Sequence, residues 1–149
     1  MITEKSFLKL HTADINKPFI LQDTMFINAI REEQSTKVVY QSDTDMTEEV
    51  QVNETPERIS QIITLPVLLV HNSEDNRIAC VNIAHIRAIT PEDGETGIVL
   101  FDDTICVNET PEKAHKLICD SIRKACVKTT RVPVEKDDVK VQSKTTAKK

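Results

Sequence analysis

The sequence predicts an α+β fold made of two tandem repeats, each of about four short strands followed by one helix, packed together as a pseudo-symmetric pair. The first observation is that the residues VNETPE occur twice, at Val52–Glu57 and at Val107–Glu112, in a chain of 149 residues. The second is that polar and apolar residues alternate before each copy, which is typical of a half-buried strand. The third is that apolar residues recur at helical spacing after each copy.

The repeated hexapeptide predicts a corner between a strand and a helix. Thr55 and Thr110 each precede a proline, which favours an extended backbone, and a threonine hydroxyl there can accept a hydrogen bond from the first helical turn. Pro56 and Pro111 would occupy the first helical position, where a missing N–H costs nothing. We therefore expect these four residues to be structural helix caps and not a catalytic site.

The repeat extends upstream of this corner. FLKLHTAD at 7–14 matches VLLVHNSE at 67–74, which aligns His11 with His71. Further matches pair KPFILQ with NRIACV, INAI with IRAI, and TKVVYQ with TGIVLF. The first repeat has about five extra residues in the polar stretch 42–49, which predicts an exposed hairpin connection. Both histidines are interpreted as exposed residues at strand ends.

Three segments follow from this alignment: a first repeat at 1–64, a second repeat at 65–127, and a flexible basic tail at 128–149. The first helix is expected to run from Thr55 to Thr64, since Pro66 stops it. The second is expected to run from Pro111 to about Val127, where the helical spacing of apolar residues ends.

The first strand of the second repeat, LPVLLV at 65–70, is apolar on both faces. Such a strand is expected to be buried on both sides. A repeat of about 60 residues also buries too little surface to be stable alone. We therefore expect the two repeats to form one body, with neither folding independently.

The composition indicates in which cellular compartment the protein is expected. No apolar run is long enough to span a membrane, and the N-terminus lacks the regions of a signal peptide. The four cysteines, Cys80, Cys106, Cys119 and Cys126, all lie in the second repeat. They are interpreted as small buried residues in a reducing cytosol and not as a disulfide framework. The expected location is the cytoplasm, or a virion if the chain is viral.

No pattern in the chain predicts an enzyme or a cofactor site. The sequence has neither a glycine-rich phosphate loop nor a GxSxG elbow, and PEDGE at 91–95 reads as a hairpin turn. His115, Cys119 and Cys126 share one edge of the second helix and are weak metal candidates. Zinc would need a fourth ligand and usually a close pair of cysteines, so we expect packing and no metal.

The segment 128–149 differs from the rest of the chain in charge. It carries seven Lys/Arg against three Asp/Glu, a net charge of +4, so the segment 1–127 carries −9 of the total of −5. Without helical periodicity, this tail is expected to be disordered. A partner-binding segment that adds a strand to an open sheet edge would use Arg131, Val132, Val134, Val139 and Val141.

Both repeats resemble the small flagellar and swarming-motility proteins of the FlbD/SwrD type and their uncharacterised relatives. The first repeat carries the resemblance in LKLHTADINKPFILQ, INAIREE, STKVVY and VQVNETPERISQII, and the second in LLVHNSEDNRIACVN, IRAITPEDGETGIVL and ICVNETPEKAHKLI. The family's hairpin glycine is replaced around Asn16 and around Asp75 and Asn76. The resemblance implies a small non-enzymatic accessory protein.

Two functions remain open. The first hypothesis is a non-catalytic protein-interaction or assembly component of a larger complex, which would bind a protein partner or a second copy of itself through sheet edges or the tail. The alternative is a nucleic-acid-binding regulatory protein that uses the basic C-terminal tail. A net charge of −9 on the segment 1–127 and few aromatic side chains favour the first hypothesis.

Overall fold

The computed structural model describes residues 2–101 and 103–134, with side chains up to Cys126. Its strands are β1 (Phe7–His11), β2 (Pro18–Gln22), β3 (Phe26–Arg31), β4 (Thr36–Asp43), β5 (Met46–Val52), β6 (Val67–His71), β7 (Ile78–Asn82), β8 (Ala88–Glu92), β9 (Glu95–Val99) and β10 (Thr104–Val107). The helices are α1 (Pro56–Ile62) and α2 (Pro111–Val134), with short 3-10 turns at Glu4–Ser6, Asp23–Met25 and Ile83–His85. The α+β class is confirmed.

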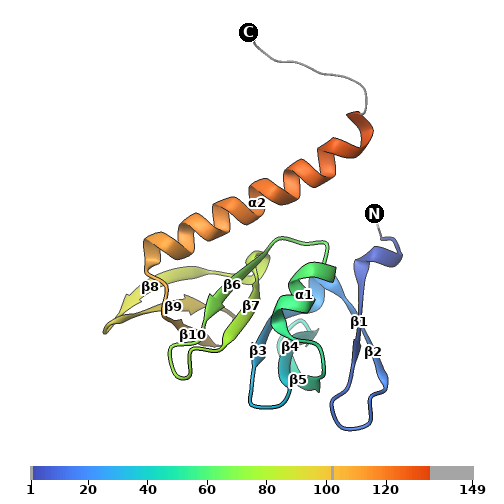
Figure 1. The fold of residues 1–149 in the computed structure, drawn as a ribbon, viewed down its shortest axis with the longest axis horizontal. Coiled ribbons are helices and arrows are strands. Elements are labelled where there is room, and N and C mark those ends of the chain that lie inside the picture. The colour runs from blue at the N-terminus through green and yellow to red at the C-terminus, as the bar shows by residue number, and fades with distance from the viewer. Residues whose placement is uncertain (1, 102, 135–149) are drawn as a thin grey trace.

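The strands form three antiparallel sheets that lie side by side (Figure 1). β1 and β2 make a two-stranded sheet, and β8, β9 and β10 make a three-stranded sheet. Between them lies a five-stranded sheet with the order β5-β4-β3-β7-β6. Its centre is the pairing of β3 with β7, which joins the first half of the chain to the second.

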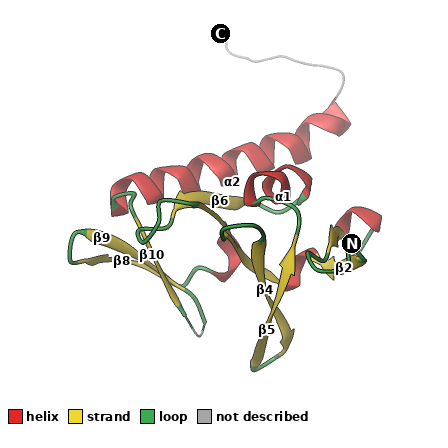
Figure 2. Cartoon of the chain, turned by 60° about the horizontal axis from the view of Figure 1, so that its bottom comes forward, coloured by secondary structure: helices red, strands yellow, loops and turns green. Residues whose placement is uncertain are grey.

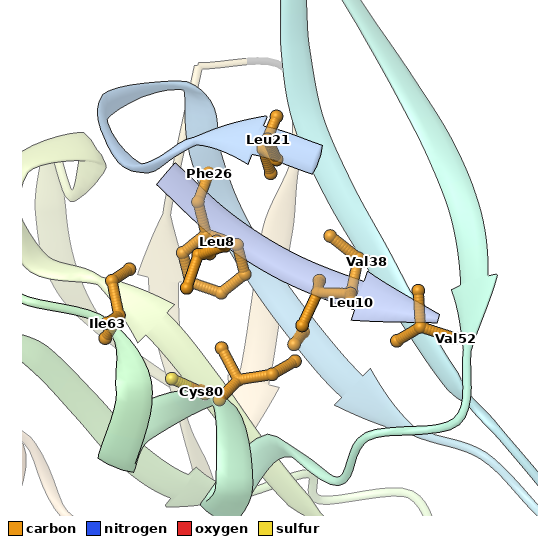
Figure 3. Close-up of a cluster of buried hydrophobic side chains, with 10 residues drawn as sticks. Leu8, Leu10, Leu21, Phe26, Val38, Val52, Ile63 and Cys80 are labelled. Carbon is orange, nitrogen blue, oxygen red and sulfur yellow. The ribbon is translucent and has the colours of Figure 1, made fainter. Parts of the chain in front are cut away.

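Two hydrophobic cores occupy the two faces of the five-stranded sheet. Figure 3 shows the first core, where Leu8, Leu10 and Leu21 from β1 and β2 meet Phe26, Val38 and Cys80 from the central sheet. Ile59 of α1 and Ile63, the residue directly after the helix, close this core. The second core lies between the central sheet and the three-stranded sheet, and α2 contributes Ala114 to it. The central sheet is therefore shared by both cores.

The prediction of a strand buried on both faces is confirmed for one face of β6, whereas Val67 and Leu69 on the other face are only half-buried. Leu68 and Val70 belong to the second core, whereas Val67 and Leu69 pack against the first. β6 is the last strand of its sheet, and α2 runs alongside it (Figure 2). The helix thereby covers an edge that would otherwise be open to pairing with another strand.

Several details differ from the expected repeats. Each half contains five strands and not four, because the segments after the 3-10 turns at Asp23–Met25 and Ile83–His85 form the additional strands β3 and β8. α1 ends at Ile62, before the expected end at Thr64, and α2 continues past Val127 to Val134. The hairpin connection at 42–49 is exposed as expected at most positions, but β4 and β5 extend into it and leave only a short turn.

The sheets also depart from pseudo-symmetric packing. The β6–β7 hairpin of the second half joins the sheet of the first half through β3. The equivalent β1–β2 hairpin of the first half stays a separate two-stranded sheet. The β6–β7 hairpin therefore pairs with the other half of the chain, whereas the β1–β2 hairpin does not.

Candidate nucleic-acid interface

Charge is distributed very unevenly between α2 and the rest of the chain. Residues 1–110 carry eight Lys/Arg and nineteen Asp/Glu, a net charge of −11. The sequence of α2 carries six Lys/Arg against two Asp/Glu, a net charge of +4. Two of the basic residues that the sequence placed in a disordered tail, Lys128 and Arg131, therefore belong to a helix.

Four basic side chains of α2 are exposed together: Lys113, Lys116, Arg123 and Lys124. Their positions fall within an arc of about 100° around the helix, and we call this surface the basic face. The sequence of α2 contains two further basic residues, Lys128 and Arg131. In Figure 1, α2 extends along the molecule and beyond the sheets.

Asp120 is an acidic residue within the basic face. Its carboxylate lies 3.1 Å from Lys116 Nζ and 3.0 Å from Arg123 Nη1. These hydrogen bonds, first of all the one from Lys116, hold the pKa of Asp120 below its usual value. Exposed ion pairs of this kind are weak, so both cations remain available to an external anion.

The other side of α2 fixes the helix to the body. Ala114 is buried in the second core, and Leu117 and Ile118 pack against that core. Ser121 Oγ donates a hydrogen bond of 2.7 Å to the carbonyl of Val67 in β6. Burial on one side thus determines that the basic face points outward.

The three metal candidates on α2 are only partly brought together. His115 Nε2 lies 3.5 Å from Cys119 Sγ, but Cys126 is exposed about two turns further along. Among the described residues, no group of three His, Cys, Asp or Glu side chains is placed to hold a metal ion.

The expectation that all four cysteines are buried is wrong. Only Cys80 is buried, Cys106 and Cys119 are half-buried, and Cys126 is exposed. Burial raises the pKa of Cys80 to about 12, with a smaller contribution from Glu57. The other three cysteines are partly open to solvent because they occupy sheet and helix margins and not core positions.

A pair of histidine–glutamate contacts was missed by sequence reasoning. Glu54 Oε2 lies 2.7 Å from His11 Nδ1, and Glu54 Oε1 accepts a 2.9 Å hydrogen bond from the His11 backbone N–H. Glu109 makes the same two contacts with His71, at 2.7 and 3.0 Å. The available signal was that each histidine aligns with the other and each glutamate belongs to the repeated hexapeptide.

Opposing effects act on these two carboxyl groups. Partial burial raises the pKa of Glu54, but the hydrogen bonds from the His11 ring and backbone outweigh it and lower the pKa overall. The pKa of Glu109 is likewise lowered by His71 against the effect of burial. Since a carboxylate only accepts hydrogen bonds, each ring nitrogen Nδ1 is the donor. The expected exposed histidines are therefore half-buried and fix the strand to the corner.

The expected caps lie at the helix N-termini. Thr55 Oγ1 accepts a hydrogen bond of 3.1 Å from the Arg58 backbone N–H, with Pro56 in the first turn of α1. Thr110 Oγ1 accepts an equivalent bond of 3.1 Å from Lys113 at the start of α2, where Pro111 is the first residue.

The structure describes only some of the residues of the expected tail. Arg131, Val132 and Val134 fall within the backbone of α2. Val139 and Val141 lie outside the described residues, as does the rest of the tail from residue 135. In the part of the chain that the structure covers, neither helix has the length and apolar character needed to cross a membrane.

Comparison with known proteins gives one structural likeness. No protein-family model matches the chain, and no curated protein matches its sequence. Among solved structures, the fold is similar to a LytTr DNA-binding domain of a putative response regulator from Bacillus cereus, with a TM-score of 0.52 and 15% sequence identity. The match covers 81% of this chain and 96% of that domain.

This likeness corrects two expectations. The resemblance to FlbD/SwrD-type proteins is wrong, since the fold is similar to a LytTr domain and no family model supports the resemblance. The hypothesis of an assembly component, cellular or in a virion, is also corrected, because the similar structure is a DNA-binding domain.

Proposed function

We propose that this chain is a nucleic-acid-binding regulatory protein that contacts DNA phosphates through the basic face of α2. The observation that carries the proposal is the separation of charge, with +4 on α2 and −11 on residues 1–110. The likeness to a LytTr DNA-binding domain supports it, because a chain with a similar architecture binds DNA.

The net negative charge of the chain argues against DNA binding, but the separation of charge removes this objection. A uniformly acidic protein repels phosphates, but cations gathered on one helix attract them locally. Each Lys or Arg that neutralises a phosphate releases condensed counterions, which drives binding at low salt. The acidic body then disfavours contact on other faces, so the charge pattern both attracts the nucleic acid and orients it.

The test is a titration of labelled duplex DNA with the full chain at several salt concentrations. Replacing Lys113, Lys116, Arg123 and Lys124 with Gln should weaken binding strongly. It should also reduce the slope of log K against log salt by roughly one for each phosphate that is no longer neutralised.

A matched control removes the same charge elsewhere. Replacing Lys9, Lys17, Lys37 and Arg87 with Gln gives the same net charge but leaves the basic face intact. This control should bind nearly as the native chain does. Equal weakening by both variants would mean that only net charge matters, and the basic face would not be the interface.

We further propose that the protein has no catalytic activity and works in the cytoplasm. Support for the compartment comes from Cys80, Cys106 and Cys119, which are thiols outside any disulfide, as expected in reducing conditions.

We also propose that the two halves descend from one repeated unit. Support comes from the matched contacts at the two corners. Besides the histidine–glutamate contacts, Asn53 Nδ2 donates to Asn16 Oδ1 at 2.8 Å and Asn108 Nδ2 donates to Asn76 Oδ1 at 2.7 Å. Asn16 and Asn76 also share a left-handed backbone, with φ of 55° and 61°, a conformation that asparagine adopts more readily than most residues.

A further inference from the structure

A groove runs between α2 and the segment that connects α1 to β6. It has a volume of about 1000 Å³, and its walls are formed by Ser60–Val67 on one side and by α2 from Leu117 to Ala125 on the other. Lys5 and Phe7 from the N-terminal segment also line it. The volume is at the upper end of the range for small-molecule sites, which is enough for more than one nucleotide.

The groove combines cations with an exposed aromatic ring. Lys124 belongs to the basic face and also lines the groove, where Lys5 provides a second cation. Phe7 is 44% exposed although it lies in β1. The acidic Asp120 in the lining is already bonded to Lys116 and Arg123. The lining therefore combines two cations with a partly exposed aromatic side chain, beside apolar residues such as Leu65 and Leu117.

Uncharged polar groups complete this chemistry. Gln61 is exposed on α1 and lines the groove. The hydroxyl of Ser121 donates to the Val67 carbonyl, which leaves its oxygen able to accept a hydrogen bond from a base. Cations along a groove, with an aromatic ring on which a base stacks, are the features that bind unpaired strands without strong sequence preference.

We propose that this groove binds a single-stranded segment of nucleic acid, with a base stacked on Phe7 and phosphates near Lys5 and Lys124. A duplex keeps the faces of its bases inside the stack, so only an unpaired strand presents them to Phe7. This inference rests on the proposed function, since the groove shares Lys124 with the basic face. It adds the form of nucleic acid that the protein prefers.

The test compares an oligo-dT strand of about 12 nucleotides with a duplex of the same length, each titrated with the full chain by fluorescence anisotropy. The native chain should bind the single strand more tightly. Phe7→Ala should weaken single-strand binding by about tenfold and leave duplex binding unchanged. Phe7→Trp, which keeps a stacking ring, should restore the native affinity.

The matched control is Phe101→Ala. Phe101 is 45% exposed, almost the same as Phe7, but it does not line this groove. Its loss should leave both affinities unchanged. Thermal melts monitored by circular dichroism check that each variant is folded, and Phe7→Leu keeps an apolar side chain in β1 while removing the ring.

The outcomes separate this inference from the proposed function. If the variant of the basic face loses binding but Phe7→Ala and Phe7→Leu bind the single strand normally, the proposed function stands and the groove assignment fails. If the single strand and the duplex bind equally, the groove assignment fails as well. If the native chain binds neither form, both proposals are wrong.

Discussion

The two histidine–glutamate contacts tie strand ends to helix starts through single residues. Each glutamate stands immediately before the N-cap threonine of a helix and bonds both the ring and the backbone of a histidine at the end of a strand. The carboxylates of Glu54 and Glu109 are largely buried, with side-chain exposures of 16% and 13%. Each contact therefore fixes the direction in which a helix leaves its sheet.

Glu54→Gln and Glu109→Gln should reduce stability near neutral pH by about 1 kcal/mol or more each, because a charged acceptor of two hydrogen bonds is lost. The folded pKa of each glutamate is lowered, so its contribution is present above the unfolded pKa and disappears as pH falls through the folded value. The difference from the native protein should shrink as the pH falls below about 4.5.

Urea melts at a series of pH values measure this difference. Glu49→Gln, an exposed glutamate on β5, is the control and should change stability little at any pH. A difference that stayed constant far below the ordinary pKa of a glutamate would show that the carboxylate charge does not stabilise the corner.

At the scale of secondary-structure elements, each helix begins with an N-cap threonine that can be identified from the sequence alone. Thr55→Ala and Thr110→Ala should each cost about 1 kcal/mol, the usual loss for an N-cap hydroxyl. Chemical denaturation measures this cost, and Thr44→Ala, in the exposed β4–β5 turn, is the matched control. Neither cap variant should alter DNA affinity, and a variant that lost binding at full stability would place the corner in the interface.

The elements that could be predicted from the sequence are those specified by patterns of neighbouring residues. The corners, the doubly apolar β6 and the amphipathic start of α2 follow from patterns within a few residues. The third strand of each half was predicted only as a short bent strand or a turn, because FINAIR and AITPE have no regular alternation. The end of α2 was also missed. Thr129, Thr130 and Pro133 are poor helix formers, yet a helix already nucleated extends cheaply.

The basic face shows a different limit. The lysines and arginines of α2 were visible in the sequence, but those after Val127 were assigned to a disordered tail. The backbone of Lys128 and Arg131 belongs instead to α2. The contacts of Glu54 and Glu109 were also missed. The repeat shows that the histidines and glutamates correspond, but no local pattern shows that a carboxylate meets a histidine so distant in the sequence.

For the whole molecule, the decisive contact is the pairing of β3 with β7. It inserts a hairpin of the second half into the sheet of the first and gives both cores a common wall. No local pattern specifies it, because which of two equivalent hairpins joins the central sheet is decided by packing over long sequence separation. The LytTr-like arrangement therefore appears only at the level of the complete chain.

This arrangement predicts that residues 1–64 do not fold alone. The fragment would lack β6 and β7, which leaves the edge of β3 unpaired and removes Cys80, Val67 and Leu69 from the first core. Its circular dichroism should show no cooperative thermal transition. Adding a second fragment of residues 65–149 should restore one, because the missing hairpin can then pair with β3. A cooperative melt of the first fragment by itself would contradict this, since it would mean that the first core is complete without the hairpin.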